Sequence, residues 1–145
     1  MLPDGEWTIE AIHRAQEWSA EAKALSKEHH AAAKQYRKHH LILTAFQTAA
    51  SAATGAVGVG MAPCPSGFLV AGLSALTTAL TGAIATVAWN VRSESHARAS
   101  DDFTDIARYI DYQMALPTSD RDRPKTAFVF VTSRFDAIES VAPLV

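Results

Sequence analysis

The feature that most constrains this chain is a stretch of 51 residues, 41–91, that contains no Asp, Glu, Lys, Arg or His. All of the 13 basic and 15 acidic residues lie in the two flanks. Roughly a quarter of the residues in a soluble domain are charged, so a solvated fold rarely leaves so long a stretch without charge. We therefore expect residues 41–91 to be removed from water, either in a lipid bilayer or in a protein core.

A proline-containing segment divides this stretch into two predicted helices. Pro63, Pro65 and Gly67 are poor helix formers, so they predict a turn at 62–67. The segments 41–61 and 68–91 on either side have 21 and 24 residues. A helix needs about 20 residues to cross the hydrocarbon core of a bilayer, so the sequence predicts a two-span transmembrane hairpin. The alternative is an Ala-rich hairpin buried in a soluble helical bundle or a large complex.

Basic residues predict the orientation of the hairpin. Lys34, Arg37 and Lys38 precede the first span, Arg92 and Arg98 follow the second, and the turn carries no charge. The positive-inside rule then places both termini on the cytoplasmic or equivalent side. The acidic start of the chain lacks a basic region followed by an apolar run, so we expect no cleaved signal peptide.

Polar and small residues recur at helical spacing in both predicted spans. They are Thr44, Gln47, Ser51, Thr54 and Gly58 in the first span, and Ser74, Thr78 and Thr81 in the second. Steps of three and four residues place each set on one helical face. Two interpretations stay open: a contact face between helices, or the hydroxyl lining of a pore that several hairpins form. Gln47 should face another helix or water, because an amide that faces lipid is costly.

The flanking segments carry apolar and aromatic residues at the same spacing. We expect juxtamembrane helices over 8–40 and 92–117 that pack as an antiparallel pair on the cytoplasmic side. The residues predicted to form this hairpin packing are Trp18, Leu25, His29, Tyr36, His96, Phe103, Ile106 and Ile110.

The C-terminal segment predicts one more helix. Phe128, Val131, Phe135 and Ile138 step by three and four residues, which favours a short amphipathic helix over 124–142. The run 127–131 also has strand propensity, but the chain offers no partner strand. We expect the apolar face of this helix to dock a partner. The predicted fold is all-α, with a single domain over 1–145.

The sequence contains no pattern typical of an enzyme. The single Cys64 excludes an internal disulfide and a multi-cysteine zinc site. The histidines form no HExxH motif or i,i+4 pair, so a metal site would need ligands from both sides of the hairpin. They could also form a pH-responsive cluster or be solvated interface residues. They are His13, His29, His30, His39, His40 and His96.

Other classes of binding chemistry are also missing from the sequence. We find no phosphate-binding loop, dinucleotide motif or nucleophile elbow. A net charge of −2 with evenly mixed flanks gives no nucleic-acid footprint. We therefore expect no catalytic residues, no cofactor, no metal, no nucleic-acid partner and no small-molecule substrate.

One family shares the arrangement of several scattered residues. They are Trp18 with His29 three turns later, Tyr36 before the first span, His96 after the second span, the helix 109–116 that ends in Leu116-Pro117, and the tail with Phe135-Asp136, Glu139-Ser140 and Pro143. In these features the chain resembles the SLATT family, the SMODS and SLOG-associating two-transmembrane effector domain. The resemblance implies a two-span membrane effector of a nucleotide-dependent conflict system, which forms pores or perturbs the bilayer. Similar two-span proteins look to be encoded by large DNA viruses with internal membranes.

Two functions from different classes follow. The first is an oligomeric, pore-forming or membrane-perturbing protein that resembles SLATT effectors. The second is a non-enzymatic structural membrane subunit of a larger assembly, such as a virion with an internal membrane or an organellar complex. Both imply the lipid bilayer as a partner, together with further copies of the chain or other subunits, because so small a helical hairpin offers little core of its own.

Overall fold

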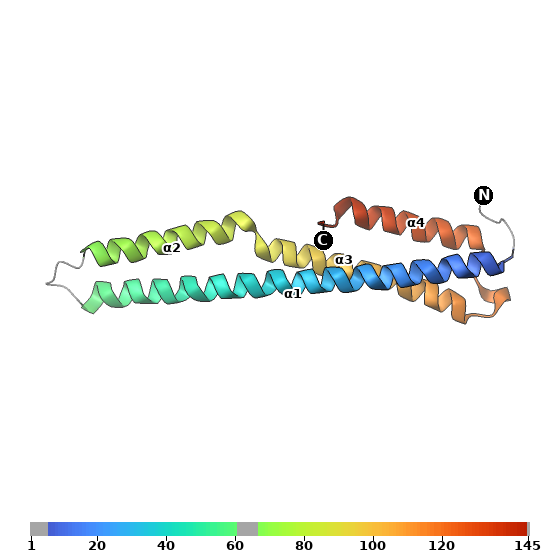
Figure 1. The fold of residues 1–145 in the computed structure, drawn as a ribbon, viewed down its shortest axis with the longest axis horizontal. Coiled ribbons are helices and arrows are strands. Elements are labelled where there is room, and N and C mark those ends of the chain that lie inside the picture. Colours follow the sequence, from blue (N-terminus) through green and yellow to red (C-terminus); the bar gives the residue numbers. More distant parts are fainter. Residues whose placement is uncertain (1–5, 61–66, 145) are drawn as a thin grey trace. The chain divides into compact units, whose positions relative to one another are not determined.

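The computed structural model of the chain describes residues 6–60 and 67–144, with the backbone alone described for 54–60, 67–70 and 83–87. Its elements are α1 (Ile9–Gly60), α2 (Gly67–Val87), α3 (Trp89–Ala115), the 3₁₀ turn η1 (Thr118–Asp120) and α4 (Pro124–Val141) (Figure 1). The described residues contain no strand, so the all-α prediction is confirmed, and the run 127–131 is helical. The predicted turn at 62–67 lies outside the described residues except for Gly67, where α2 begins.

The predicted and observed helices differ by one to three residues at most of their ends, and the largest difference is at the end of the second predicted span. The segment 68–91 is not one helix, because α2 ends at Val87 and α3 begins at Trp89. Between them Ala88 has φ 46°, in the left-handed region that L-residues enter at a cost of about 1–2 kcal/mol. The amide of Arg92 donates to the carbonyl of Ala88 at 3.0 Å, so α3 starts from this bent residue.

Contacts divide the chain into two units. Unit 1 contains Met1–Ala33 and Glu94–Val145, and unit 2 contains Lys34–Ser93. Helices α1 and α3 contribute residues to both units.

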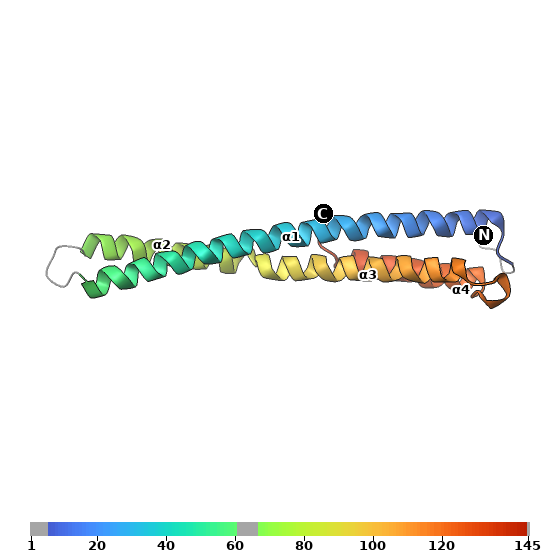
Figure 2. The ribbon, with the colours of Figure 1, turned by 90° about the horizontal axis from the view of Figure 1, so that it is seen from below.

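Unit 1 is a three-helix packing of α1, α3 and α4, which lie side by side in both views (Figures 1 and 2). Small alanines on α1 face large apolar side chains of α3 and α4, so the helices approach closely. The core consists of Ala11, Ala15, Ala22, Ala99, Phe103, Ile106, Ala107, Ile110, Phe128, Val131 and Ile138. Phe103 lies at its centre with 1% of its surface exposed, and its ring contacts His29 and Phe135 at centroid distances of 5.6 Å each.

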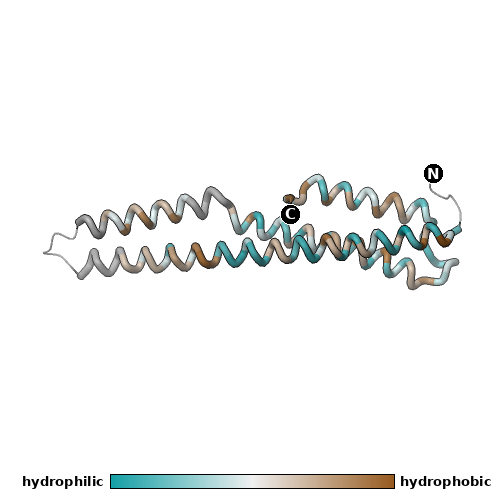
Figure 3. The backbone as a smooth tube through the Cα atoms, viewed as in Figure 1, coloured by the Kyte–Doolittle hydropathy of each residue, from teal (hydrophilic) through white to brown (hydrophobic). Residues whose placement is uncertain are grey.

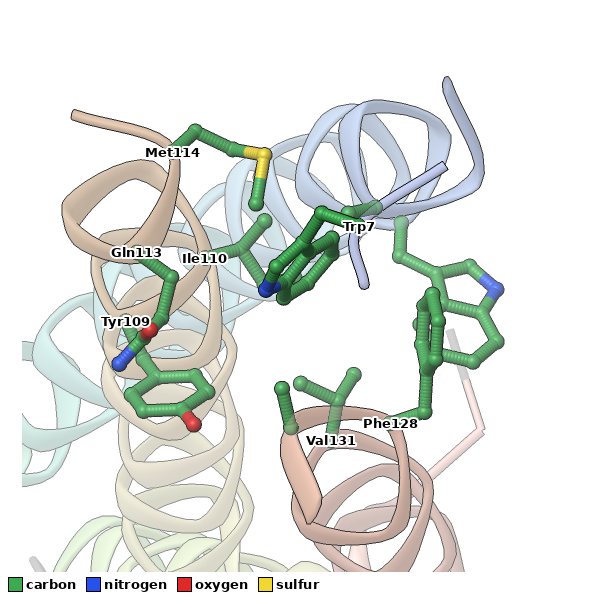
Figure 4. A pocket seen from close by; sticks show the side chains of 10 residues that line it. Trp7, Tyr109, Ile110, Gln113, Met114, Phe128 and Val131 are labelled. Atoms are coloured by element: carbon green, nitrogen blue, oxygen red, sulfur yellow. The ribbon is translucent and has the colours of Figure 1, made fainter. Parts of the chain in front are cut away.

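An aromatic cluster closes the end of unit 1 where α1 begins. The Phe128 ring lies 5.8 Å from Trp7 and 5.1 Å from Trp18, the latter in an edge-to-face arrangement. Figure 4 shows Trp7, Phe128 and Met114 around a shared space between the helices. That space is about 10 Å³, which is barely enough for one water molecule, so it is a small packing gap rather than a ligand pocket.

Asp122 fastens the loop before α4 to the rest of unit 1. Its carboxylate accepts hydrogen bonds from the Tyr109 hydroxyl at 2.8 Å and from Nε2 of the buried Gln113 at 2.9 Å. Its amide donates to Gln113 Oε1, and its carbonyl accepts from Trp7 Nε1, both at 2.9 Å. Burial, together with the hydrogen bond to Asp122 and its negative charge, raises the pKa of the Tyr109 phenol above its ordinary value.

Unit 2 contains the hairpin of α1 and α2. Its seam is formed by half-buried residues at steps of four and three: Leu43, Gln47 and Ala50 on α1, and Leu73, Thr77 and Leu80 on α2. Of the residues between 41 and 91 whose side chains are described, none is buried. In Figure 3 the colour of α1 changes from teal to brown where the basic segment meets the charge-free one. Among the residues that the structure describes, no helix combines the length and apolar character needed to cross a membrane.

Phe103 should be the residue on which the stability of unit 1 depends most. We expect Phe103→Ala to lower the free energy of unfolding by about 3–5 kcal/mol, because it leaves a cavity between three helices. Denaturant unfolding of the full chain, followed by tryptophan fluorescence, measures this change. Tyr112→Ala on the same helix is the control: its side chain is 61% exposed, so the change should stay within about 0.5 kcal/mol. Equal losses in both variants would contradict the assigned core.

Candidate functional site

Two histidines meet inside unit 1, one from α1 and one from α3. The Nδ1 atoms of His29 and His96 lie 3.0 Å apart, and the two residues are only 4% and 1% exposed. One Nδ1 must carry a proton and donate while the other accepts. The His29 ring also stacks on Phe103, so the pair is enclosed by protein on its apolar side.

The pair belongs to a line of polar contacts along the interface of α1 and α3. Ser26 Oγ shares hydrogen bonds with Ser100 Oγ at 3.2 Å and Thr104 Oγ1 at 2.8 Å. Further along α1, Ser19 Oγ donates to Asp111 Oδ1 at 2.7 Å, and Lys23 Nζ lies 2.8 Å from Asp111 Oδ2. These contacts hold only at one alignment of the two helices, so they fix the register that apolar packing alone would leave loose.

Two pKa shifts follow from this geometry. Burial lowers the pKa of His29 below its ordinary value, and the nearby negative charge of Glu28 opposes that effect. The hydrogen bond with Lys23, supported by the one from Ser19, lowers the pKa of the Asp111 carboxyl. If both rings were imidazolium, both Nδ1 atoms would be donors, and the hydrogen bond of 3.0 Å between them could not form.

The same pair bears on the alternative of a metal site that the sequence left open. His29 and His96 do approach from the two sides, as a metal site across the hairpin would require. However, the described residues contain no group of three or more His, Cys, Asp or Glu that could hold a metal ion. The geometry of the pair is that of a buried hydrogen bond.

The second candidate site is one face of the hairpin in unit 2. Gln47 Nε2 donates to Thr81 Oγ1 at 2.7 Å, so the amide does face another helix. The hydroxyls of Thr44 and Thr48 donate to the carbonyls four residues earlier, at 2.8 and 2.9 Å. Thr78 does the same to Ser74 at 2.9 Å. Their protons are therefore satisfied within each helix, while their oxygens can still accept.

Helical geometry brings the polar residues of both helices to one side of the hairpin. Successive residues rotate by about 100°, so Thr44 and Ser51 lie a quarter turn to one side of the α1 seam. Ser74 and Thr81 lie a quarter turn to the same rotational side of the α2 seam. Because the helices are antiparallel, these two flanks coincide in space, as the Gln47–Thr81 bond requires. We call this side the hydroxyl face: Thr44, Thr48, Ser51, Ser74, Thr78 and Thr81, all of them exposed.

The opposite side of the hairpin is apolar. It carries Ile42, Phe46, Ala49, Ala53, Gly72, Leu76 and Ala79. The side chains of Ile42, Phe46 and Leu76 are 45%, 64% and 51% exposed. We call this side the apolar face. Thr54 and Gly58 of the predicted polar stripe fall among the residues whose side chains are not described.

The residues predicted to pack in the flanks separate between the two units. His29, His96, Phe103, Ile106 and Ile110 lie in the core of unit 1, with Trp18 and Leu25 against it. Tyr36 belongs to unit 2, where its ring meets Trp89 edge to face at 5.9 Å. His39, which the predicted set did not include, stacks on the Trp89 ring at a centroid distance of 4.8 Å.

The predicted docking face of the C-terminal helix is occupied within the chain. Phe128, Val131 and Ile138 are 3%, 2% and 6% exposed, and Phe135 packs against the same core. This face is therefore unavailable to a partner while α4 is docked on α1 and α3. The apolar side chains that α4 exposes are Val129, Phe130 and Val141.

Comparison with protein-family models, with curated proteins and with solved structures finds no match for this chain. The resemblance to the SLATT family therefore stays a prediction.

The histidine pair should make unit 1 sensitive to acid. The unfolded chain binds protons at His29 near pH 6.5, whereas the folded unit resists them, so the unfolded state binds more protons below that pH. We expect the free energy of unfolding to fall as the pH drops through about 6.5 towards the lowered pKa of His29. Denaturant titrations between about pH 8 and 5 measure this slope.

A double-mutant cycle tests whether the histidine pair causes this pH dependence of the free energy of unfolding. His96→Leu should cost about 1–3 kcal/mol at neutral pH, because it leaves buried His29 without its partner. His29→Leu/His96→Leu should cost less than the sum of the single changes and should flatten the pH dependence. His30→Leu, at an exposed position, is the control. An unchanged slope in the double variant would assign the acid sensitivity to other groups.

Proposed function

We propose that the chain is an oligomeric, two-span integral membrane protein whose hairpins assemble with their hydroxyl faces around a water-filled pore. The observation that carries this proposal is the two-sidedness of the hairpin: a hydroxyl face and an apolar face on two helical segments, 41–60 and 67–87, that contain no charged residue. Neither face is covered within unit 2, so each needs a different environment. Lipid suits the apolar face, and other copies of the chain or water suit the hydroxyl face.

The charge-free stretch supports the bilayer as that environment. It includes residues 54–70 and 83–87, whose side chains are not among those described, and it contains no charge at any of its 51 positions. Exposed side chains as large as Phe46 and Leu76 stabilise a helix in lipid and destabilise it in water. The basic residues at both ends support termini on the cytoplasmic or equivalent side.

The hydroxyl face favours a pore over a surface that serves only for contacts between helices. The Gln47–Thr81 bond already joins the two helices of one hairpin, and the hydroxyl of Thr77, the other polar residue of the seam, donates to the Leu73 carbonyl within α2. The other exposed hydroxyls of this face form no hydrogen bond across the hairpin among the described residues, so they are available to line a pore. They are those of Thr44, Thr48, Ser51, Ser74 and Thr78. A pore-forming or membrane-perturbing activity is also what the resemblance to SLATT effectors implies.

Leakage from liposomes tests this function with a matched pair of variants. The full chain is reconstituted into dye-loaded liposomes, and Ser51→Leu should reduce leakage of the dye by at least about tenfold. Each copy would contribute one leucine, and together these leucines would form an apolar constriction that expels water from the pore. Ala49→Leu introduces the same side chain on the apolar face and should leave leakage within about twofold. Gln47→Leu is unsuitable for this comparison because it also breaks the bond to Thr81.

Alkaline-carbonate extraction of membranes decides the interpretation of this assay. Retention of the chain in the pellet, together with dye leakage that Ser51→Leu reduces, would support the proposal. A chain that stays in the pellet without leakage would overturn the pore and favour the structural membrane subunit. Release by carbonate would overturn the membrane proposal itself.

A further inference from the structure

A groove between α3 and α4 in unit 1 contains a cavity that the proposed pore does not use. The volume of this cavity is about 90 Å³, whereas the gap beside Trp7 has about 10 Å³. It therefore has room for several water molecules or for one small organic molecule. The residues that line it are Asp102, Asp105, Ile106 and Tyr109 of α3, and Phe130, Arg134 and Ile138 of α4.

Helical spacing brings these side chains into one groove. The lining residues of α4 are four positions apart, and those of α3 recur three and four positions apart, so each set lies on one helical face. Ile106 and Ile138 are only 3% and 6% exposed and form an apolar floor. Asp102, Asp105 and Arg134 have exposed side chains, so a ligand from solvent can reach all three charges.

The two helices run in opposite directions along the groove. The rings of Tyr109 and Phe130 lie 4.6 Å apart, and the rings of Phe103 and Phe135 lie 5.6 Å apart. Lower residue numbers of α3 therefore lie beside higher residue numbers of α4. It follows that Tyr109 and Phe130 form one end of the groove and that Asp102 lies toward the other end.

The positive and negative charges of the groove do not meet. The guanidinium carbon of Arg134 lies 5.6 Å from the centre of the Phe130 ring, which is within the range of a cation–π contact and holds this cation at the aromatic end. None of the ion pairs among the described residues joins Arg134 to Asp102 or Asp105. Asp105 pairs with the exposed Arg108 of its own helix at 3.3 Å, and Asp102 belongs to no such pair. A cation and a free carboxylate therefore line one cavity without neutralising each other.

We propose that this groove binds a free α-amino acid with a short aliphatic side chain. The carboxylate of the ligand accepts hydrogen bonds from Arg134, whose guanidinium presents two parallel N–H donors to a carboxylate. The ammonium of the ligand donates to Asp102 and Asp105. Its aliphatic side chain packs on the apolar floor and against the ring of Phe130, which is 39% exposed.

A zwitterion fits this groove better than a ligand with one charge. An anion would pair with Arg134 but would meet the negative charges of Asp102 and Asp105, and a cation would meet the positive charge of Arg134. A ligand with both charges at opposite ends is attracted by both sets. The inference concerns unit 1 alone, so it does not depend on the pore or on the insertion of the hairpin into a bilayer.

Three ligands with the same branched carbon skeleton separate the roles of the two charges. L-valine carries both charges, isobutylamine lacks the carboxylate, and isovalerate lacks the ammonium. We would measure the binding of each ligand to the full chain in a mild non-ionic detergent by saturation-transfer difference NMR. L-valine should bind with a Kd of about 1 mM or lower. Each analogue should bind at least about tenfold more weakly, because it loses one set of charge-assisted hydrogen bonds.

Two variants with matched controls assign the ends of the ligand. Arg134→Gln should weaken the binding of L-valine by at least about tenfold, whereas Arg123→Gln, at an exposed position outside the cavity, should change it by less than about twofold. Asp102→Asn should weaken it by about three- to tenfold, because Asp105 remains. Its control is Asp101→Asn, the neighbouring exposed carboxylate that does not line the cavity. All of these side chains are exposed, so the variants should fold.

Each outcome supports or overturns the site. Saturable binding of L-valine that Arg134→Gln and Asp102→Asn weaken, and that their controls do not, would support it. Equal binding of L-valine and isobutylamine, or equal losses in the variants and their controls, would overturn it. Absence of saturable binding up to about 10 mM would also overturn it. Carbonate extraction and dye leakage test the membrane proposal separately, so failure of one proposal is distinguishable from failure of the other.

Discussion

The constraint on which this structure depends is that the hairpin of α1 and α2 buries none of its described side chains between residues 41 and 82. Two helices in contact can bury only the seam between them, here Leu43, Gln47 and Ala50 against Leu73, Thr77 and Leu80. The rest of both helices must be covered from outside the unit, and the chemistry of the uncovered surface limits what can cover it. One side exposes hydroxyl groups and the other exposes aliphatic and aromatic side chains, so one uniform environment cannot solvate both sides well.

Unit 1 is stabilised in a different way from the hairpin. Three helices enclose a core, and Phe103 is among its most fully buried side chains. Polar residues still run along the interface of α1 and α3, where each one meets a partner on the facing helix. Alanine-rich surfaces slide easily past one another because their ridges are shallow, whereas hydrogen bonds have one good alignment. The polar line thus supplies a definite register, and the apolar core supplies most of the stability.

Much of the architecture could be predicted from the sequence, because it follows from spacing. The three- and four-residue steps of the flanks predicted the helices, and Phe103, Ile106 and Ile110 do lie in a core. The same spacing assigned His29 and His96 only a packing role, since periodicity shows which face a residue occupies and not which atom it meets. Their hydrogen bond depends on the register of two helices that are far apart in sequence.

Other features left no signal in the sequence. The left-handed conformation of Ala88 occurs at a residue type that favours helices, so nothing predicted the break between α2 and α3. The periodic face of α4 was correctly identified as apolar, but a pattern cannot distinguish a face that docks a partner from one that docks on its own chain. The coincidence of the two hydroxyl flanks needed the pairing of Gln47 with Thr81 to fix how the helices face each other.

The order of the chain gives unit 1 a further property. Its two parts, Met1–Ala33 and Glu94–Val145, are separated in the sequence by the whole of unit 2. His29 and His96 are 67 positions apart, and Trp7 and Asp122 are 115 apart. During synthesis the first part therefore emerges long before the residues that will cover it, and closing so long a loop is slow. Unit 2 is synthesised while unit 1 is still incomplete, and pairing of α1 with α2 in the hairpin shortens the effective loop that unit 1 has to close. The contact between His29 and His96 can therefore form only after the whole of unit 2 has been synthesised.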